Sequence, residues 1–571
     1  MTDVGPGDPA AAGLSVILEA YAAHRCEFDR ITARAGTHFA SRQWREMQAD
    51  ATRRLGSYRA AIDRLEEAVA AAMGGRTGDR FVWAEMKRRL AAELAGRHDA
   101  PLAATFFNSI TRRLFGTVGV ARDVEFVSGE APPREGRGDP VSLPIPSAPA
   151  PELVGKIIAS VSPGVAFEDP VRDALLVGER IAGAIPPGPV AAEMAVKPFY
   201  RGLGGYLVGR LLPEDGPALP IVLAVGNHPE GARVEAVLLD EQDVSILFSY
   251  TRSYFHVETE DPAALVEFLS GLLPRKRRAE LWISIGFDKH GKTELYGDLI
   301  GFLESSGERF ERAPGVPGMV MVAFGMPSQD LVFKVIRDSF PAPKQTTRRA
   351  VMERYRLVFG HDRAGRLIDA WEFEHLELDR DRFEPGLLDE LLSTAGRSVE
   401  AVGSRVVLHH AYVERRVTPL DVYVRTRPSQ QAAAALIDMG DAVRDLALSG
   451  IFPGDMLVKN FGVTRSGRVV FYDYDELALL TTVNFRRIPE PEHPEDEMRS
   501  GPTWGAGPAD VFPEEFRSFL GLPEPLREIF ETVHADLFDP ITWHRIQDLV
   551  RRGEPVEIPP YAPQRRLDTT R

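Results

Sequence analysis

Residues 454–476 constrain this chain more than any other stretch, because polar side chains stand there at fixed distances around a short apolar run. Asn460 follows Asp455 by five residues, and Asp473 follows Asp455 by 18 residues. A Gly turn and the apolar run 469–471 lie between Asn460 and Asp473, which predicts a strand that ends beside Asp473. Phosphoryl transfer uses an Asp to orient a hydroxyl, with an Asn and a second Asp to hold metal ions. The first hypothesis is therefore a site for a nucleoside triphosphate.

The bulk composition limits the classes of protein to consider. At 571 residues the chain is too long for one hydrophobic core, so we expect two or three domains. A formal net charge of −15 argues against a nucleic-acid partner, because neutralising phosphates requires a basic surface. The single Cys26 excludes an intrachain disulfide framework and a zinc site built on cysteines.

The sequence carries no sign of a membrane or export signal. Residues 1–9 have neither the basic region nor the apolar core of a signal peptide. No stretch approaches the run of about 18 apolar residues that a membrane helix needs. We therefore expect no membrane association and a cytoplasmic location.

The first half of the chain is predicted to be one unit of mixed α/β structure over residues 13–308, without a catalytic signature of its own. A Gly-, Pro- and Ala-rich tail over 1–12 is predicted to be disordered. Apolar periodicity and turn residues then predict helices over about 14–97 and 106–115, a loop over 128–152, strands between about 193 and 290, and a helix over 291–305.

The second half, residues 309–571, begins with strands and continues with helices. Segments 319–324 and 331–336 are predicted to pair as strands, and a helix is expected over about 347–358. Further strand signals occur over 406–413, followed by helices between about 430 and 449. A strand-rich lobe before a helical lobe is the layout of protein kinases, so the chain is predicted to be α+β, with a bilobal protein-kinase-like domain after the N-terminal unit.

Lys334 lies inside an otherwise apolar strand, where a charge is costly unless it meets an anion. We predict that it binds nucleotide phosphates; a lysine that reaches into solvent from an edge strand is the alternative. The last glycine of the candidate phosphate loop, Gly318, lies 16 residues before Lys334, and a plain turn is the alternative for this loop. Its residues are Ala313, Pro314, Gly315, Val316, Pro317, Gly318 and Met319.

The carboxylate that would pair with Lys334 stays open at this point. Glu353 lies 19 residues after Lys334 on a predicted helix, and Glu372 and Glu374 are alternatives; for each of them a solvated helix or strand face is also consistent. Residues 412–416 are expected to join the two lobes, where backbone groups would contact an adenine edge.

The catalytic stretch departs from protein kinases on both sides of its motif. Pro453 and Gly454 replace the usual His-Arg pair, and Tyr474-Asp475 replaces Phe-Gly, which is closer to small-molecule phosphotransferases of the aminoglycoside-kinase type. Asp473 and Asp475 are expected on one side of a strand. Asp475 and Glu476 are then either a solvated turn or a second proton-transfer site.

Seven segments make the chain similar to the bacterial isocitrate dehydrogenase kinase/phosphatase family. They are 106–109, 199–210, 332–336, 412–416, 451–457, 459–465 and 510–516. The resemblance implies an enzyme that phosphorylates a Ser of NADP-dependent isocitrate dehydrogenase with ATP and Mg²⁺, with Mn²⁺ as an alternative. It also implies removal of this phosphate with nucleotide, ATP or ADP, bound, which controls the branch between the tricarboxylic acid cycle and the glyoxylate bypass. The N-terminal domain would be regulatory, with AMP bound near its junction with the kinase domain.

The resemblance also assigns roles to individual residues. It implies an ATP loop over 313–319 and a phosphate-binding Lys334. It makes Asp455 the kinase Asp, and Asn460 and Asp473 the metal ligands. It links Asp475 and Glu476 to the dual activity, and Asp369 to the phosphatase activity, although Ala370 stands where the family more usually has Thr. The alternative for Asp369 is an acid at a helix terminus.

Two other functions stay open on the residues alone. A small-molecule kinase would need a compact pocket, and a nucleotide sensor would not need the complete set of catalytic residues. The Pro-rich stretch 488–526, with Trp504 and Phe512, favours a surface that docks a protein. The oligomeric state cannot be predicted from this sequence.

Overall fold

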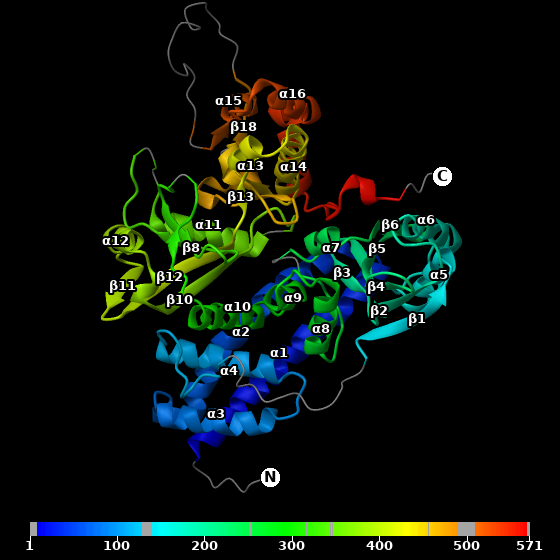
Figure 1. Cartoon of the computed structure of the whole chain (residues 1–571). Helices are drawn as coiled ribbons and strands as arrows, with labels where there is room; N and C mark the ends of the chain where they lie inside the picture. The colour runs from blue at the N-terminus through cyan, green and yellow to red at the C-terminus, as the bar shows by residue number, and fades with distance from the viewer. Residues whose placement is uncertain are drawn as a thin grey trace, which may run out of the picture.

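The computed structural model describes residues 8–127, 140–250, 254–315, 317–342, 344, 346–361, 363–454, 456–488, 507 and 509–567 (Figure 1). Helices open the described chain: α1 (Pro9–Ala40), α2 (Trp44–Met73), α3 (Arg80–Leu94) and α4 (Ala100–Phe115). The Asp8 carboxylate caps α1 by accepting the backbone N–H groups of Ala10 and Ala11. The predicted disordered tail is therefore wrong for residues 9–12, which form the first turn of α1, while residues 1–7 lie outside the described part.

An antiparallel sheet follows in the order β1-β2-β4-β5-β6, with β3 paired to β4. Its strands and the helices that share its core are β1 (Ser142–Ala148), β2 (Val190–Ala195), β3 (Phe199–Arg201), β4 (Gly204–Pro213), β5 (Leu219–His228), β6 (Gly231–Leu238), α5 (Ala150–Ser160) and α6 (Pro170–Ala182). The loop predicted over 128–152 is wrong in its second part, which forms β1 and the start of α5; residues 128–139 lie outside the described chain. Pro144 and Pro146 fit β1 because it is an edge strand, which needs hydrogen bonds on one side only.

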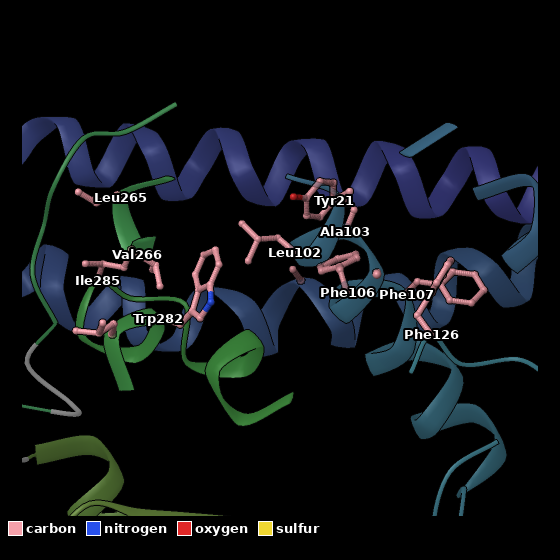
Figure 2. Close-up of a cluster of buried hydrophobic side chains, with 14 of the residues drawn as sticks. Tyr21, Leu102, Ala103, Phe106, Phe107, Phe126, Leu265, Val266, Trp282 and Ile285 are labelled. Atoms are coloured by element: carbon pink, nitrogen blue, oxygen red, sulfur yellow. The ribbon is translucent and has the colours of Figure 1, made fainter. Parts of the chain in front are cut away.

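Helices after this sheet tie it to the N-terminal helices. They are α7 (Glu241–Leu247), α8 (Pro262–Leu272), α9 (Arg278–Ser284) and α10 (Asp288–Ser305). Figure 2 shows the cluster that joins them: Tyr21 of α1, Phe106 of α4 and Trp282 of α9 belong to one buried apolar core. Burial of such large side chains supplies most of the driving force for this packing.

The second sheet has the order β10-β12-β9-β8-β7, with β11 paired to β12. Its strands and neighbouring helices are β7 (Glu311–Arg312), β8 (Met321–Gly325), β9 (Leu331–Ile336), β10 (Ala370–Asp379), β11 (Val399–Val402), β12 (Arg405–Arg415), α11 (Arg348–His361) and α12 (Pro385–Thr394). The pairing of β8 with β9 and the helix α11 confirm the predictions for 319–324, 331–336 and 347–358.

Helix α10 packs on one face of this second sheet and shares its hydrophobic core (Figure 1). Leu295 and Leu299 of α10 and Ile283 of α9 belong to the same buried cluster as Phe324 and Phe333 of the sheet. The last helices of the N-terminal half are thus physically part of the strand-rich lobe.

The helical lobe completes the chain and confirms the α+β class. Its elements are β13 (Thr418–Pro419), α13 (Leu420–Thr426), α14 (Ser429–Leu448), β14 (Ile451–Phe452), β15 (Phe461–Val463), β16 (Val469–Phe471), β17 (Ala478–Leu479), β18 (Asn484–Phe485), β19 (Asp510–Val511), α15 (Phe516–Phe519), α16 (Glu524–Val533) and α17 (Pro540–Arg551). Of the predicted docking stretch, residues 489–506 and 508 lie outside the described part, and Phe512 is buried rather than exposed.

The C-terminal segment, drawn red in Figure 1, returns from the helical lobe to the N-terminal half. Arg566 forms a β-bridge with Ala236 of β6, and the Leu567 side chain is buried in the core of the first sheet. None of the helices that the structure describes is long and apolar enough to cross a membrane.

Candidate nucleotide and phosphoryl-transfer site

A cavity of about 850 Å³ lies between the second sheet and the helical lobe. It brings together most of the predicted site residues: Ala313, Pro314, Gly315, Pro317, Gly318, Met319, Lys334, Asn460, Asp473, Asp475 and Glu476. Val316 and Asp455 lie outside the described residues, and Asp369 does not line the cavity.

The predicted phosphate loop connects β7 to β8 along one wall of this cavity. The backbone N–H of Ala313 donates to the carbonyl of Ala323 at 2.9 Å, which closes the base of the loop. A Cβ atom at Gly318 would approach the carbonyl oxygen of Met321 to 2.8 Å, so a side chain there would force the loop away from β8. The glycine thus lets the loop fold closely over the cavity.

Lys334 points from β9 into the cavity, where a buried carboxylate holds it. Its Nζ lies 2.7 Å from Oε2 of Glu414 and donates to the carbonyl of Tyr472 at 3.0 Å. Glu414 stands on β12, the neighbouring strand, and its side chain is 2% exposed. Burial raises the pKa of Glu414, although the charge of Lys334 and the hydrogen bonds that Glu414 accepts lower it.

The three candidates for this carboxylate were wrong. Glu353 pairs with Arg349 on the exposed surface of α11, Glu372 bonds His410, and Glu374 is exposed. The signal that could have found Glu414 is strand alternation, since it places every second residue of β12 on the cavity side.

Helix α11 contributes a tyrosine to this arrangement instead of a glutamate. The Tyr355 hydroxyl donates to Oε1 of Glu414 at 2.8 Å, and its ring stacks on Tyr412 with centroids 3.7 Å apart. Burial and the nearby Glu414 carboxylate raise the pKa of Tyr355, so the hydroxyl stays a donor. Lys334, Glu414 and Tyr355 therefore form a chain from the cavity to α11.

The hairpin β15–β16 brings the two candidate metal ligands to one wall. Phe461 pairs with Phe471 across the hairpin, and the Tyr472 N–H donates to the Asn460 carbonyl at 3.1 Å. Asn460 and Asp473 flank this contact, and both line the cavity. Within the described residues no group of three or more His, Cys, Asp or Glu side chains surrounds a metal position. An amide oxygen and one carboxylate fit a divalent cation such as Mg²⁺, which takes few protein ligands and completes its shell with phosphate oxygens and water.

Asp475 and Glu476 lie in a short 3₁₀ turn, Tyr474–Glu476, after β16. The prediction that Asp473 and Asp475 share one face of a strand is therefore wrong, because the strand ends at Phe471. Gly454 has φ 80°, and a Cβ there would lie 2.5 Å from the Glu476 carbonyl, so glycine lets this acidic turn approach the catalytic loop.

At the acidic end of the cavity, the pKa values of Asp475 and Lys344 are both above their ordinary values. Burial and the adjacent Asp473 raise the pKa of Asp475 to about 6, against the lowering effect of Lys344 and Lys334. Burial lowers the pKa of Lys344, but its hydrogen bond to Glu476 and the nearby carboxylates raise it above its ordinary value. The cavity therefore holds a lysine at its acidic end that the sequence reasoning missed.

Asp369 lies outside the cavity, just before β10 and not at a helix terminus. Its Oδ2 is 3.8 Å from Nε of Arg415, whose guanidinium also pairs with Glu280 of α9. This acid therefore borders the packing between α9 and β12, and the cavity residue next to it is Ile368.

The connection between the lobes begins four residues later than predicted, at residue 416 rather than 412. Residues 412–415 still belong to β12, and residues 416–419 lead through β13 into α13. Arg415, Val417 and Pro419 line the cavity along this connection.

Comparison with known proteins covers nearly the whole chain. Residues 14–307 match the family model of the isocitrate dehydrogenase kinase/phosphatase (AceK) regulatory domain, and residues 308–563 match the kinase domain of the same family. The chain is 46% identical to the isocitrate dehydrogenase kinase/phosphatase of Anaeromyxobacter dehalogenans (strain 2CP-C), over 98% of both chains. It is 38% identical to that of Xanthomonas euvesicatoria pv. vesicatoria (strain 85-10), again over 98% of both.

Proposed function

The chain belongs to the isocitrate dehydrogenase kinase/phosphatase family, and we propose that it phosphorylates a Ser of NADP-dependent isocitrate dehydrogenase with ATP and also removes this phosphate. A kinase and a phosphatase activity, with use of ATP and a divalent metal ion, follow from the family. The substrate would be inactivated by phosphorylation, which controls the branch between the tricarboxylic acid cycle and the glyoxylate bypass. We further propose Mg²⁺ as the metal, with Mn²⁺ as an alternative, AMP as allosteric effector and a cytoplasmic location.

The observation that supports this proposal is the cavity in which Lys334, Asn460 and Asp473 meet the glycine-containing loop. Lys334 would bind the α- and β-phosphates, held in place by Glu414. The backbone N–H groups of the loop would cover the phosphates. Asn460 and Asp473 would hold the divalent cation, which supplies charge neutralisation at the phosphates when bound.

Asp455 would orient the Ser hydroxyl and accept its proton as the phosphoryl group is transferred. Because phosphoryl transfer depends mainly on positioning and charge stabilisation, these few groups suffice for the kinase direction. For hydrolysis, Asp475 would orient a water molecule towards the phosphoserine, and Glu476 and Asp369 would support this direction.

The decisive experiment uses the purified full chain, Mg²⁺-ATP and NADP-dependent isocitrate dehydrogenase. Dehydrogenase rate and phosphoserine are followed, after which ATP is replaced by ADP and AMP. We expect loss and then recovery of dehydrogenase activity, with no phosphorylation by Asp455→Ala. ATP binding without phosphoserine formation would overturn the proposal.

The phosphatase assignment of Asp475 has its own test. Asp475→Ala should bind nucleotide normally and lose dephosphorylation. Retained phosphatase activity with normal nucleotide binding would remove Asp475 from this role. A small-molecule phosphotransferase is not favoured, because the relatives that align over 98% of the chain carry the dehydrogenase kinase/phosphatase name.

A further inference from the structure

Lys344 is one of three lysines that line the cavity, with Lys334 and Lys459, and the proposed mechanism does not use it. It lies between β9 and α11, and its side chain is 17% exposed. Its Nζ lies 2.7 Å from Oε1 of Glu476 and 4.0 Å from Oδ2 of Asp475. The ion pair thus crosses from the strand-rich lobe to the acidic turn of the helical lobe.

Lys334 and Lys344 have different partners. The partner of Lys334 is Glu414, a buried acid on a strand of the same sheet. The partner of Lys344 is Glu476, whose side chain is 41% exposed and belongs to the other lobe. An ion pair with a partly exposed acid exchanges with water and ligands more easily than a buried one. Lys344 is therefore the cation that can adjust when an anion enters.

The position of the acidic turn, directly after Asp473, indicates which phosphate of the nucleotide would lie beside it. In kinase sites the metal ion held by such an Asp neutralises the β- and γ-phosphates, so Asp473 would stand near these two phosphates, whereas Lys334 would bind the α- and β-phosphates. Asp475 and Glu476 follow Asp473 directly, so they would lie at the γ end of the polyphosphate. Two carboxylates there repel a γ-phosphate unless a cation neutralises them.

Four arginines that line the cavity are paired away from this turn. Arg312 and Arg337 both bond Glu390, Arg415 pairs with Glu280, and Arg425 bonds Asp421 at 2.9 Å. Lys459, the remaining lysine of the lining, is exposed and belongs to the 3₁₀ turn Val458–Asn460 before β15. Among the contacts of the described residues, Lys344 is the cation that pairs with Glu476.

We propose that Lys344 is a positioning residue that neutralises the Asp475–Glu476 pair and thereby gives the site its preference for a nucleoside triphosphate over a diphosphate. The inference rests on the proposed function, since it assumes that the cavity binds ATP. It concerns binding, so it can be tested without turnover.

The experiment measures the affinities of the full chain for ATP and ADP, each with Mg²⁺, by calorimetry. Lys344→Met should lose affinity for ATP by about tenfold or more, the typical effect of losing a charge-assisted contact. Affinity for ADP should fall clearly less. Lys344→Arg should restore the ATP preference, since it keeps the charge.

Two further variants separate this role from a structural one. Lys156→Met removes an equivalent lysine, paired with Glu152 at 2.9 Å on the exposed face of α5, and should leave both affinities unchanged. In a Glu476→Gln background, Lys344→Met should lower ATP affinity much less, because the repelling charge is already gone. Thermal unfolding checks each variant, and Lys344→Gln replaces Lys344→Met if the latter is unfolded.

The outcomes are distinguishable. Equal loss of ATP and ADP affinity in Lys344→Met, or no loss, would overturn the inference, as would an undiminished effect in the Glu476→Gln background. If the wild-type chain binds no ATP, the proposed function itself fails.

Discussion

The two faces of the second sheet meet different surroundings, a hydrophobic core on one side and the cavity on the other, and β9 shows this within six residues. Leu331, Phe333 and Val335 are buried in the core that α9 and α10 share with the sheet. Val332 and Lys334 line the cavity on the other face. Strand alternation thus places a buried apolar residue on either side of Lys334, the lysine proposed to bind phosphates.

The comparison shows that the helical cover from the N-terminal half supports the site. A charged cavity wall is held in position by the apolar face behind it, because packed cores resist deformation. The regulatory-domain match ends at residue 307, yet α10 belongs to the same core as Phe333. A shift of α10 would therefore be transmitted through this packing to β9, the strand that carries Lys334.

The largest effect is expected from breaking the apolar face. Phe333 is fully buried and packs against the rings of Phe310 and Phe324, with centroids 5.3 and 5.5 Å away. Phe333→Ala should lower the free energy of unfolding by about 3–5 kcal/mol, because it leaves a cavity in the shared core. Thermal and denaturant unfolding measure this. Wild-type stability would show that α10 and the sheet do not depend on this packing.

The adjacent residue on the opposite face should affect activity instead. Lys334→Met should lower kcat/KM for ATP by about 10²–10³-fold, the usual cost of removing a donor to a transition-state charge. The unfolding midpoint should fall less than in Phe333→Ala. Burial already raises the pKa of Glu414, so without Lys334 this carboxyl can take up a proton and keep its bond from Tyr355. A stability loss as large as that of Phe333→Ala would contradict this division between the faces.

The sequence predicts the strands and helices of the kinase-like lobes well, because their apolar periodicity is strong. It also predicts which residues line the cavity, since Lys334, Asn460 and Asp473 stand at spacings set by the chemistry. The expectation that failed is the partner of Lys334. The sequence leaves the partner open among Glu353, Glu372 and Glu374, but the pairing register puts Lys334 opposite Tyr412, which brings Glu414 close. Register between distant strands is a tertiary property that local patterns do not contain.

The other wrong predictions also have tertiary reasons. Proline residues in 142–148 suggest a loop, yet an edge strand tolerates them. The alternation of residues predicts that a strand continues to Asp475, but the chain turns at Tyr474, whose hydroxyl donates to the Ile368 carbonyl at 2.9 Å. Neither the edge position of β1 nor this long-range hydrogen bond is visible in neighbouring residues.

The partner of Lys334 offers a test of intermediate size. Glu414→Gln removes the charge that holds the Lys334 ammonium 2.7 Å away, so KM for ATP should rise by about tenfold or more. Glu353→Gln is the matched control, because Glu353 pairs with Arg349 on the exposed surface of α11. That variant should change stability by less than about 0.5 kcal/mol and leave KM unchanged. The KM for ATP of the two variants decides between Glu414, the partner of Lys334 in the structure, and Glu353, a candidate from the sequence. A larger effect of Glu353→Gln would refute the role of Glu414.

The smallest effect should come from the far end of the same chain of contacts. Tyr355→Phe removes a hydrogen bond to Glu414 but leaves the Lys334 pair and the stacking on Tyr412, so it should cost about 0.5–1.5 kcal/mol. If α11 positions Lys334 through Glu414, part of this cost will appear as a two- to tenfold rise in KM for ATP, since a tenfold change in affinity corresponds to about 1.4 kcal/mol. Tyr200→Phe makes the same change at a buried hydroxyl that donates to the Pro163 carbonyl in the N-terminal half. It should lower stability without altering KM. Equal kinetics in the two variants would mean that the Tyr355 hydroxyl stabilises the lobe but does not orient the lysine.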